Sequence, residues 1–258
     1  MSTILFNQII FGPIKSRRLG ISLGVNLLPA FGKWCSFDCI YCECGWNKDG
    51  KEDKKLPCAE DVILALEDRL QLMKAEGELP DTITFSGNGE PTMHPDFESI
   101  INTTLDLRQK YAPNAKVSVL TNGSRISIES VKRALLKVDN AIIKIDSCDE
   151  SLIKLIDRPQ YEYSLKKIVE GLEPFAEKFV LQTMFLKGKI DGNLVDTSTE
   201  ELANGWRDLV RIVKPREIMI YTIDRETPLE GLEKVSIERM QEIAEPLIKE
   251  GFTVKISG

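Results

Sequence analysis

Residues 81–87 read "DTITFSG", a short run of β-branched and aromatic residues that ends in glycine. This composition is typical of a strand that stops at a turn. Runs of the same kind occur elsewhere along the chain, and each is predicted to be a strand. They cover residues 20–28, 115–123, 141–147, 178–186 and 217–224.

Amphipathic segments separate these strands, because their apolar residues recur at helical spacing. The regular alternation of strand and helix predicts βαβ units and therefore an α/β fold with a parallel sheet. The pattern fits a (β/α) barrel, full or partial, and also an open doubly wound sheet. The predicted helices cover residues 60–76, 96–111, 128–137, 164–177, 199–213 and 236–251.

Polar residues gather just after the predicted strands, in "SGNGEP", "TNGS", "DSCDE" and "TIDRE". In both architectures the active site lies at this edge, where the carboxyl ends of the strands and their following loops converge. No linker or charge run divides the chain. We therefore expect one domain over residues 1–258, with 1–20 as an N-terminal extension and 21–258 as the barrel core.

The composition is that of a globular protein, with 258 residues, 42% of them hydrophobic and 29% charged. The net charge of −6 gives no general reason to expect nucleic-acid binding. No stretch approaches the roughly 18 apolar residues of a membrane span, and the first residues lack the basic start of a signal peptide. We expect no membrane association and a reducing cytoplasm, where clustered cysteines bind metal more often than they form disulfides.

Four of the six cysteines lie in "KWCSFDCIYCECG", residues 33–45. Three of them follow the spacing C-x3-C-x2-C, and thiolates suit either zinc or an iron–sulfur cluster. A structural zinc site needs four ligands, so it would require Cys44 or Cys58 as the fourth. Three thiolates on a [4Fe–4S] cluster would leave one iron open for catalysis. The three cysteines are Cys35, Cys39 and Cys42.

This spacing resembles the signature of the radical S-adenosylmethionine (radical SAM) superfamily, C-x3-C-x-aromatic-C, in which Tyr41 is the aromatic residue. Residues 85–97, "FSGNGEPTMHPDF", resemble the Gly-Gly-Glu motif that holds the methionine end of SAM in this superfamily. The resemblance implies that Glu90 accepts a hydrogen bond from the SAM amino group. Its neighbours would bring the backbone close to the cofactor, with Asn88 standing where glycine is commonest. The motif comprises Gly87, Asn88, Gly89 and Glu90.

The same resemblance implies the chemistry. A [4Fe–4S] cluster on the three cysteines would chelate SAM through its open iron and pass one electron to the sulfonium. The 5′-deoxyadenosyl radical formed in this way would abstract hydrogen from a substrate, while the protein binds, orients and shields the reactants. An electron donor such as flavodoxin or ferredoxin would be a partner.

The chain resembles, from about residue 11 to 228, a radical SAM subfamily related to the wyosine tRNA-base synthases. The matching stretches include "FGPIKSRRLGISLGVNLLP", "VLTNGS", "IIKIDSCDESLIKLIDRP", "LQTMF" and "MIYTIDRETP". The resemblance implies a partial (β/α)6 TIM-type barrel with cluster and SAM at the carboxyl ends of the strands. Residues at these ends would hold the nucleoside part of SAM, namely Asn122, Ser124, Asp146, Gln182, Tyr221 and Thr222.

The substrate is unidentified and is expected to be a small molecule, a nucleic acid or a protein. Arg17, Arg18 and Lys144 are candidates for contacting it, because arginine suits planar anions and a lysine with a lowered pKa suits Schiff-base chemistry. A nucleic-acid base is one expected target, by the wyosine resemblance. The alternatives are an activase that places a glycyl radical on a partner protein and a non-enzymatic zinc-binding module.

Four further residues have no motif of their own. His94 begins a His-Pro-Asp sequence that reads as the start of a helix. The thiols outside the signature hold an auxiliary cluster or stay uncoordinated, and they are Cys44, Cys58 and Cys148.

Overall fold

The computed structural model describes residues 4–16, 18–50 and 55–258. The described chain forms two compact units. The N-terminal unit comprises Ile4–Ser36 and Asn47–Ile142, and the C-terminal unit comprises Phe37–Trp46 and Ile143–Gly258. The single domain expected from the sequence stays a prediction.

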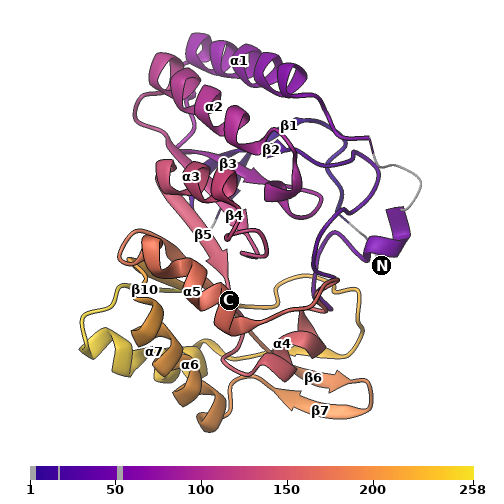
Figure 1. Cartoon of the computed structure of the whole chain (residues 1–258), viewed down its shortest axis with the longest axis vertical. Coiled ribbons are helices and arrows are strands. Elements are labelled where there is room, and N and C mark those ends of the chain that lie inside the picture. Colours follow the sequence, from indigo (N-terminus) through magenta and orange to yellow (C-terminus); the bar gives the residue numbers. More distant parts are fainter. Residues whose placement is uncertain (1–3, 17, 51–54) are drawn as a thin grey trace. The chain divides into compact units, whose positions relative to one another are not determined.

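The N-terminal unit is built on a mostly parallel sheet (Figure 1). Its strand order is β1-β2-β3-β4 with β5 next, and β2, β3 and β4 run parallel while β1 pairs with β2 in the antiparallel sense. The strands are β1 (Ile10–Ser16), β2 (Gly20–Asn26), β3 (Thr82–Ser86), β4 (Lys116–Thr121) and β5 (Asn140–Lys144), which continues into the other unit. The helices are α1 (Ala59–Glu76), α2 (Phe97–Tyr111) and α3 (Glu129–Lys137), with short 3-10 turns η1 (Asn47–Gly50) and η2 (Pro91–Met93).

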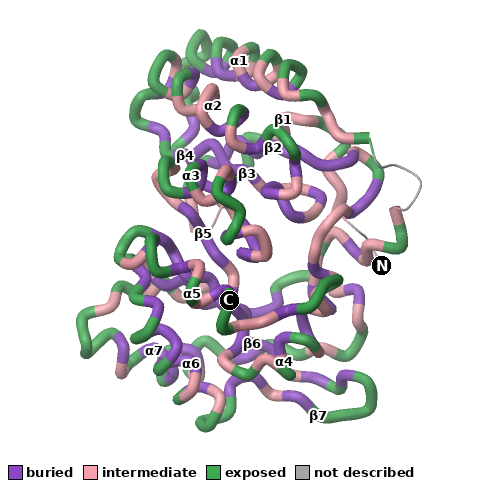
Figure 2. The backbone as a smooth tube through the Cα atoms, viewed as in Figure 1, coloured by how far each residue is buried: buried purple, intermediate pink, exposed green. Residues whose placement is uncertain are grey.

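Helix α1 shows why the sequence folds locally as predicted. The Sγ atom of Cys58 accepts a hydrogen bond from Asp61 N at its start, and Gly77 ends it in the left-handed conformation with φ 75°. Its buried face is an apolar stripe at four-residue spacing, typified by Leu66 and Leu70. Figure 2 shows the opposite face of α1 exposed, and α2 packs beside it.

Strands β3 and β4 are buried along most of their length, as strands of a parallel sheet are when both faces are covered. Hydroxyl groups within the sheet satisfy one another. The side chains of Ser22 and Thr84 lie 2.8 Å apart, and those of Thr82 and Ser118 are equally close. These buried hydroxyl groups of the sheet are therefore hydrogen-bonded to each other.

Strand β1 is the outermost strand of the path. Its pairing with β2 shifts register between Phe11 and Ile14, which marks a bulge, and Pro13 lies inside that bulge. The strand lies within the segment that the sequence analysis treated as an extension.

The C-terminal unit contains the parallel strands β6-β8-β10. Strand β6 is long, and its second half also pairs with β7 and β9 in the antiparallel sense. The strands are β6 (Val180–Ile190), β7 (Asn193–Asp196), β8 (Glu217–Thr222), β9 (Leu232–Lys234) and β10 (Val254–Ser257). The helices are α4 (Glu150–Ile156), α5 (Leu165–Leu172), η3 (Glu173–Phe175), α6 (Glu200–Val213) and α7 (Ile237–Lys249).

Trp206 of α6 is the largest fully buried side chain of this unit. Its ring meets that of Phe185 edge to face at 5.5 Å, and its Nε1 donates to Thr183 Oγ1 at 3.0 Å. These contacts fix helix α6 to β6. Gln182, a predicted site residue, immediately precedes Thr183 in β6.

The prediction of an α/β fold with parallel strands is confirmed. Each predicted strand and helix is present, and in neither unit does the strand path close on itself within the described residues. Within the described residues, the prediction lacked the strands β1, β7, β9 and β10, the helix α4 and the 3-10 turns η1 and η2.

Candidate active site

Glu90 is the centre of a buried hydrogen-bond cluster in the N-terminal unit. It lies in the turn after β3, is 2% exposed, and its Oε1 accepts hydrogen bonds from the hydroxyl and amide of Thr92 at 2.6 and 3.1 Å. Thr121, the last residue of β4, also donates to Oε1 at 2.7 Å. The backbone amide of Asn122 donates to Oε2 at 2.8 Å. Oε1 is thus fully engaged, whereas Oε2 carries one hydrogen bond from the described residues.

Burial raises the pKa of the Glu90 carboxyl, although the hydrogen bonds from Thr92, Asn122 and Thr121 oppose the rise. A buried carboxylate held only by neutral donors is stabilised further when a ligand donor reaches its remaining lone pair. The position is therefore suited to accept a hydrogen bond from an amino group.

The glycines beside Glu90 are required by the protein's own backbone. Gly89 has φ 138°, and a Cβ there would lie 2.0 Å from the carbonyl oxygen of Trp34. Gly87 has φ 117°, and a Cβ there would lie 2.5 Å from Asn26 Oδ1. The motif resemblance predicts glycine here for close approach of the cofactor, whereas in the structure the immediate reason is the close approach of neighbouring protein atoms.

Asn88 makes its side-chain contacts within the protein. The side chain is fully buried, and its Nδ2 donates to the carbonyl oxygens of Pro29 at 2.7 Å and Phe6 at 2.9 Å. Its carbonyl oxygen accepts from Trp34 N at 2.8 Å. A role for Asn88 in cofactor binding stays a prediction, and it would involve the backbone rather than the amide side chain.

Asn122 brings the end of β4 to the first cysteine of the signature. Its Nδ2 lies 3.6 Å from Cys35 Sγ and 2.9 Å from Ser36 Oγ. Ser36 Oγ in turn lies 2.7 Å from Ser124 Oγ. Asn47 fixes the backbone of Cys35 by two further hydrogen bonds, of 3.0 and 3.2 Å. Four predicted site residues of the N-terminal unit are therefore connected by hydrogen bonds, namely Cys35, Glu90, Asn122 and Ser124.

The other two signature cysteines lie in the C-terminal unit on a loop that is tied to the end of α4. Asp38 N donates to the carbonyl of Asp157 at 3.0 Å, and Ile40 N donates to the carbonyl of Ile156 at 2.9 Å. Cys39 is buried and Cys42 is half-buried, and Cys42 N donates to Cys39 O at 3.1 Å. This turn presents the two thiols from a fixed backbone.

Tyr41, between these cysteines, enters a buried charge network. Its hydroxyl donates to Asp146 Oδ2 and lies 3.3 Å from Asp157 Oδ1. Lys144 Nζ lies 2.9 Å from Asp146 Oδ2 and 2.5 Å from Asp157 Oδ1. The ammonium also lies over the rings of Phe37 and Tyr41, at 5.2 and 5.4 Å from their centroids.

The network holds Lys144 charged. Burial alone would lower the pKa of Lys144, but the carboxylates of Asp146 and Asp157 outweigh it and the pKa lies well above its ordinary value. Burial raises the pKa of Asp157, which Asp146 reinforces and Lys144 opposes. Burial and the two carboxylates also raise the pKa of Tyr41. A protonated, ion-paired amine is not prepared for the Schiff-base chemistry considered for Lys144.

Three more predicted residues lie in the C-terminal unit. Gln182 of β6 is buried, and its side-chain amide makes no hydrogen bond to the described residues. Thr222 Oγ1 accepts a hydrogen bond from Val235 N at 2.9 Å, which anchors the chain after β9. Tyr221 is half-buried in β8. Their contacts with SAM stay predictions.

The basic pair before β2 is only partly described. Arg17 lies outside the described residues, and Arg18 is half-buried with its amide 3.3 Å from Ser16 Oγ. His94 has the structural role predicted for it, because its Nδ1 accepts from Asp96 N at 3.1 Å and its Nε2 lies 2.9 Å from Pro57 O.

Two of the remaining thiols make hydrogen-bonding contacts with helices. Cys58 caps α1, and Cys148 lies against α6, where its Sγ is 3.8 Å from the carbonyl of Leu202. Cys44 is half-buried on the loop that carries Cys42. Five residues that complete the two clusters carry no motif in the sequence, namely Asp157, Thr92, Thr121, Ser36 and Asn47.

A family model described as the radical SAM superfamily matches residues 30–199. The chain belongs to this superfamily. Membership implies SAM and a [4Fe–4S] cluster as cofactors, and it makes the protein a radical SAM enzyme rather than a non-enzymatic zinc module.

Among curated relatives, the UPF0026 protein of Methanocaldococcus jannaschii is 34% identical over 183 residues. The alignment covers 69% of this chain and 54% of that protein, so the chain spans about half the length of this relative.

Two solved structures have the same fold. A radical SAM methyltransferase from Sphaerobacter thermophilus has a TM-score of 0.68 and 14% identity, with 92% of this chain and 65% of that chain covered. TYW1 with a lysine–pyruvate adduct bound has a TM-score of 0.62 and 17% identity, with coverage of 88% and 73%. No helix within the described residues of this radical SAM enzyme is long and apolar enough to cross a bilayer.

Proposed function

We propose that this radical SAM enzyme cleaves S-adenosylmethionine reductively and abstracts a hydrogen atom from its substrate. The observation that supports this most directly is the Glu90 cluster. A buried carboxylate with a remaining acceptor site lies in the same unit as Asn122, which connects it to Cys35. This arrangement suits a cofactor that offers an amino group next to an iron–sulfur cluster.

The donor set fits the cluster that the family implies. Cys35, Cys39 and Cys42 would be the ligands, because thiolates are the usual protein donors to iron–sulfur clusters. An amide N–H such as that of Asn122, 3.6 Å from Cys35 Sγ, is the kind of outer contact that stabilises a ligating thiolate. When bound there, the reduced cluster would supply one electron for cleavage of SAM into methionine and a 5′-deoxyadenosyl radical.

The protein's part is to orient SAM and exclude water. Glu90 would accept from the amino group through Oε2. Asn122, Ser124 and Gln182 offer polar groups to the nucleoside, and the Gln182 amide is the most available of these because it has no other hydrogen bond within the described residues. Roles for Tyr41, Asp146, Tyr221 and Thr222 toward SAM stay predictions.

We infer that the substrate is a nucleic-acid base, because the longer matching stretches resemble the wyosine tRNA-base synthases and TYW1 has the same fold. TYW1 carries a lysine–pyruvate adduct in that structure. Lys144 is not suited to such an adduct here, since Asp146 and Asp157 keep its amine protonated. Any pyruvate-like chemistry would need another amine. The activase alternative, the flavodoxin or ferredoxin donor and the cytoplasmic location stay predictions.

The proposal is tested on anaerobically reconstituted protein reduced with dithionite and supplied with SAM but no substrate. Slow release of 5′-deoxyadenosine and methionine in near-equal amounts is expected, because the radical is quenched by nearby groups. Chromatography of the quenched reaction measures both products.

The matched control is the Cys39→Ala variant, which lacks one cluster ligand and should release neither product. Methylthioadenosine or S-adenosylhomocysteine as the main enzyme-dependent product would contradict reductive cleavage at the S–C5′ bond, while the iron–sulfur assignment would stand.

A further inference from the structure

Asn88 occupies the motif position at which glycine is commonest, and its side chain binds the first described segment of the chain. Its Oδ1 accepts a hydrogen bond from Phe6 N at 2.8 Å, and its Nδ2 donates to Phe6 O at 2.9 Å. The amide therefore pairs with both backbone groups of one residue, as a neighbouring strand would. The same Nδ2 donates to Pro29 O at 2.7 Å.

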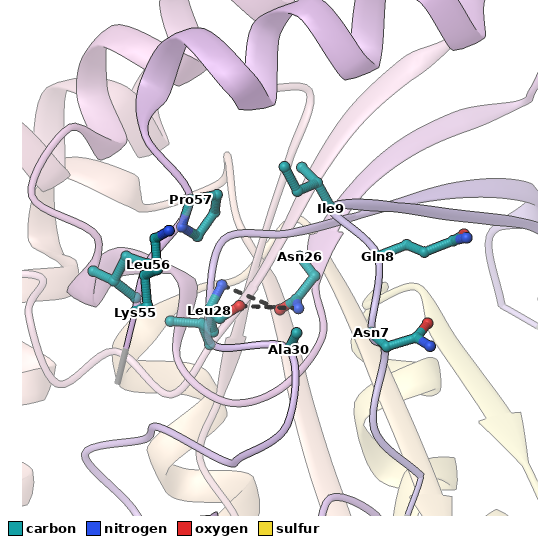
Figure 3. Close-up of a pocket in the computed structure, with 9 residues that line it drawn as sticks. All are labelled: Asn7, Gln8, Ile9, Asn26, Leu28, Ala30, Lys55, Leu56 and Pro57. Carbon is teal, nitrogen blue, oxygen red and sulfur yellow. Dashed lines mark hydrogen bonds between the residues drawn. The ribbon is translucent and has the colours of Figure 1, made fainter. Parts of the chain in front are cut away.

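Asn26, at the end of β2, completes the connection. Its Oδ1 accepts from Asn88 N at 3.1 Å and from Leu28 N at 3.2 Å. Its Nδ2 donates to Leu28 O at 3.1 Å and to Phe6 O at 3.2 Å. Both bonds to Leu28 are visible in Figure 3. Asn26 and Asn88 are both buried, and both bind the backbone of Phe6. We name these two residues the asparagine clamp.

The clamp holds the segment 4–9 mainly by polar contacts. A pocket of about 160 Å³ is lined on one side by Asn7, Gln8 and Ile9 and on another by residues 55–57 (Figure 3). Apolar packing is therefore incomplete along this stretch. The Phe6 ring stacks on Phe11 at 3.7 Å, and Asn26 N donates to the carbonyl of Ile9 at 2.7 Å. The side-chain hydrogen bonds of the clamp add the attachment at Phe6.

The clamp also reaches the residues beside Glu90. The carbonyl of Asn88 accepts from Trp34 N at 2.8 Å, and the carbonyl of Trp34 accepts from Glu90 N at 3.1 Å. A continuous set of hydrogen bonds thus runs from Phe6 through Asn88 and Trp34 to the backbone of Glu90. Displacement of Phe6 would remove partners from Asn88 and loosen the turn that carries Glu90.

We propose that Asn88 is a positioning residue that couples the segment 4–9 to the SAM-binding turn 87–90. This coupling rests on the proposed function, in which that turn holds SAM. Coupling between two sites is reciprocal. A held segment strengthens SAM binding, and bound SAM in turn protects the segment from local opening.

The first test compares SAM affinity in anaerobically reconstituted holoenzyme by calorimetry. Asn88→Gly restores the commonest motif residue but removes the hydrogen bonds to Phe6 and Pro29. We expect its dissociation constant for SAM to rise about tenfold, within the usual range of coupling between sites. Iron content should be unchanged. A second variant, Phe6→Ala, removes the stacked ring that also holds the segment but keeps the backbone groups that Asn88 binds, so it should raise the constant in the same direction by a smaller factor.

The second test follows the segment itself in the wild type and in the same variant. Hydrogen exchange of the amides in residues 4–9 is measured in the wild-type holoenzyme with and without SAM, and SAM should slow it; in Asn88→Gly the exchange should be fast in both cases. A dissociation constant within twofold of wild type together with SAM-independent exchange would overturn the coupling alone. Absence of any SAM binding by the wild-type protein would instead overturn the proposed function and the coupling with it.

Discussion

Replacing Lys144 by methionine is expected to cost about 3–5 kcal/mol in the free energy of unfolding, the range for removing one partner of a buried ion pair. Methionine keeps an unbranched apolar stem but withdraws the ammonium that lies 2.9 Å from Asp146 Oδ2 and 2.5 Å from Asp157 Oδ1. Two buried carboxylates would then share the Tyr41 hydroxyl without a cation.

This loss is expected to grow as the pH rises. Burial raises the pKa of Asp157 in the wild type, and Lys144 opposes that rise, so the variant should have a still higher pKa at Asp157. A carboxyl with a higher pKa in the folded than in the unfolded state binds a proton on folding, and stability therefore falls as the pH rises through that interval. The variant should be nearer to wild type at about pH 5 than at about pH 8.

The assay is urea unfolding of cluster-free, thiol-reduced protein at both pH values, followed by circular dichroism. With a denaturant slope of about 3 kcal/mol per M, a loss of about 4 kcal/mol lowers the midpoint by more than about 1 M. Lys154→Met is the control, because Lys154 is exposed and pairs with Glu150 in a solvent-screened surface bridge that contributes little to stability. Adding Asp157→Asn to Lys144→Met should recover much of the loss. Equal midpoints for the two lysine variants at about pH 8 would refute the reasoning.

Two further outcomes concern the SAM-binding turn. Glu90→Gln should weaken SAM binding by about 1.5–3 kcal/mol. The loss should be smaller at lower pH, because burial raises the pKa of Glu90 and the wild-type carboxyl itself becomes neutral there. An unchanged dissociation constant by calorimetry near pH 8 would remove Glu90 from the site. Gly89→Ala should impair folding or SAM binding, because the new Cβ would lie 2.0 Å from a backbone oxygen. The control is Gly251→Ala, which adds backbone strain alone, since Gly251 has φ 98° and nothing lies within 4 Å of a Cβ there. Equal thermal stability and SAM affinity in these two alanine variants would contradict the steric argument.

The fold was predictable where the sequence repeats a simple pattern. Strands such as β3 and β8 are short runs rich in β-branched and other apolar residues and are followed by polar residues, and the helices between the strands carry apolar stripes. Helix α4 was missed because its seven residues bury only Ile153 and Ile156, too few to establish a period. Strand β1 was missed because Gly12 and Pro13 interrupt it, and both residues usually mark a turn.

The candidate site was predictable at the strand ends but not in its supporting contacts. Glu90 and Asn122 follow strands, so a parallel sheet places them at the same edge. Asp157 comes beside Tyr41 only because α4 turns the chain back toward the cysteine loop, which no local pattern indicates. The direction of the Lys144 pKa was also beyond the sequence, since burial and carboxylates act in opposite directions and only their distances decide the balance.

The interrupted outer strand β1 has a consequence for how copies of the protein meet in solution. An exposed edge strand of a sheet is a template to which a strand from another molecule can pair. Pro13 offers no amide hydrogen to such a strand, and the register shift between Phe11 and Ile14 breaks the even row of donors and acceptors that it would need. Cross-molecule strand addition is thereby discouraged along this edge. Concentrated protein should consequently resist sheet-mediated aggregation from this side during the long anaerobic handling that cluster assembly demands.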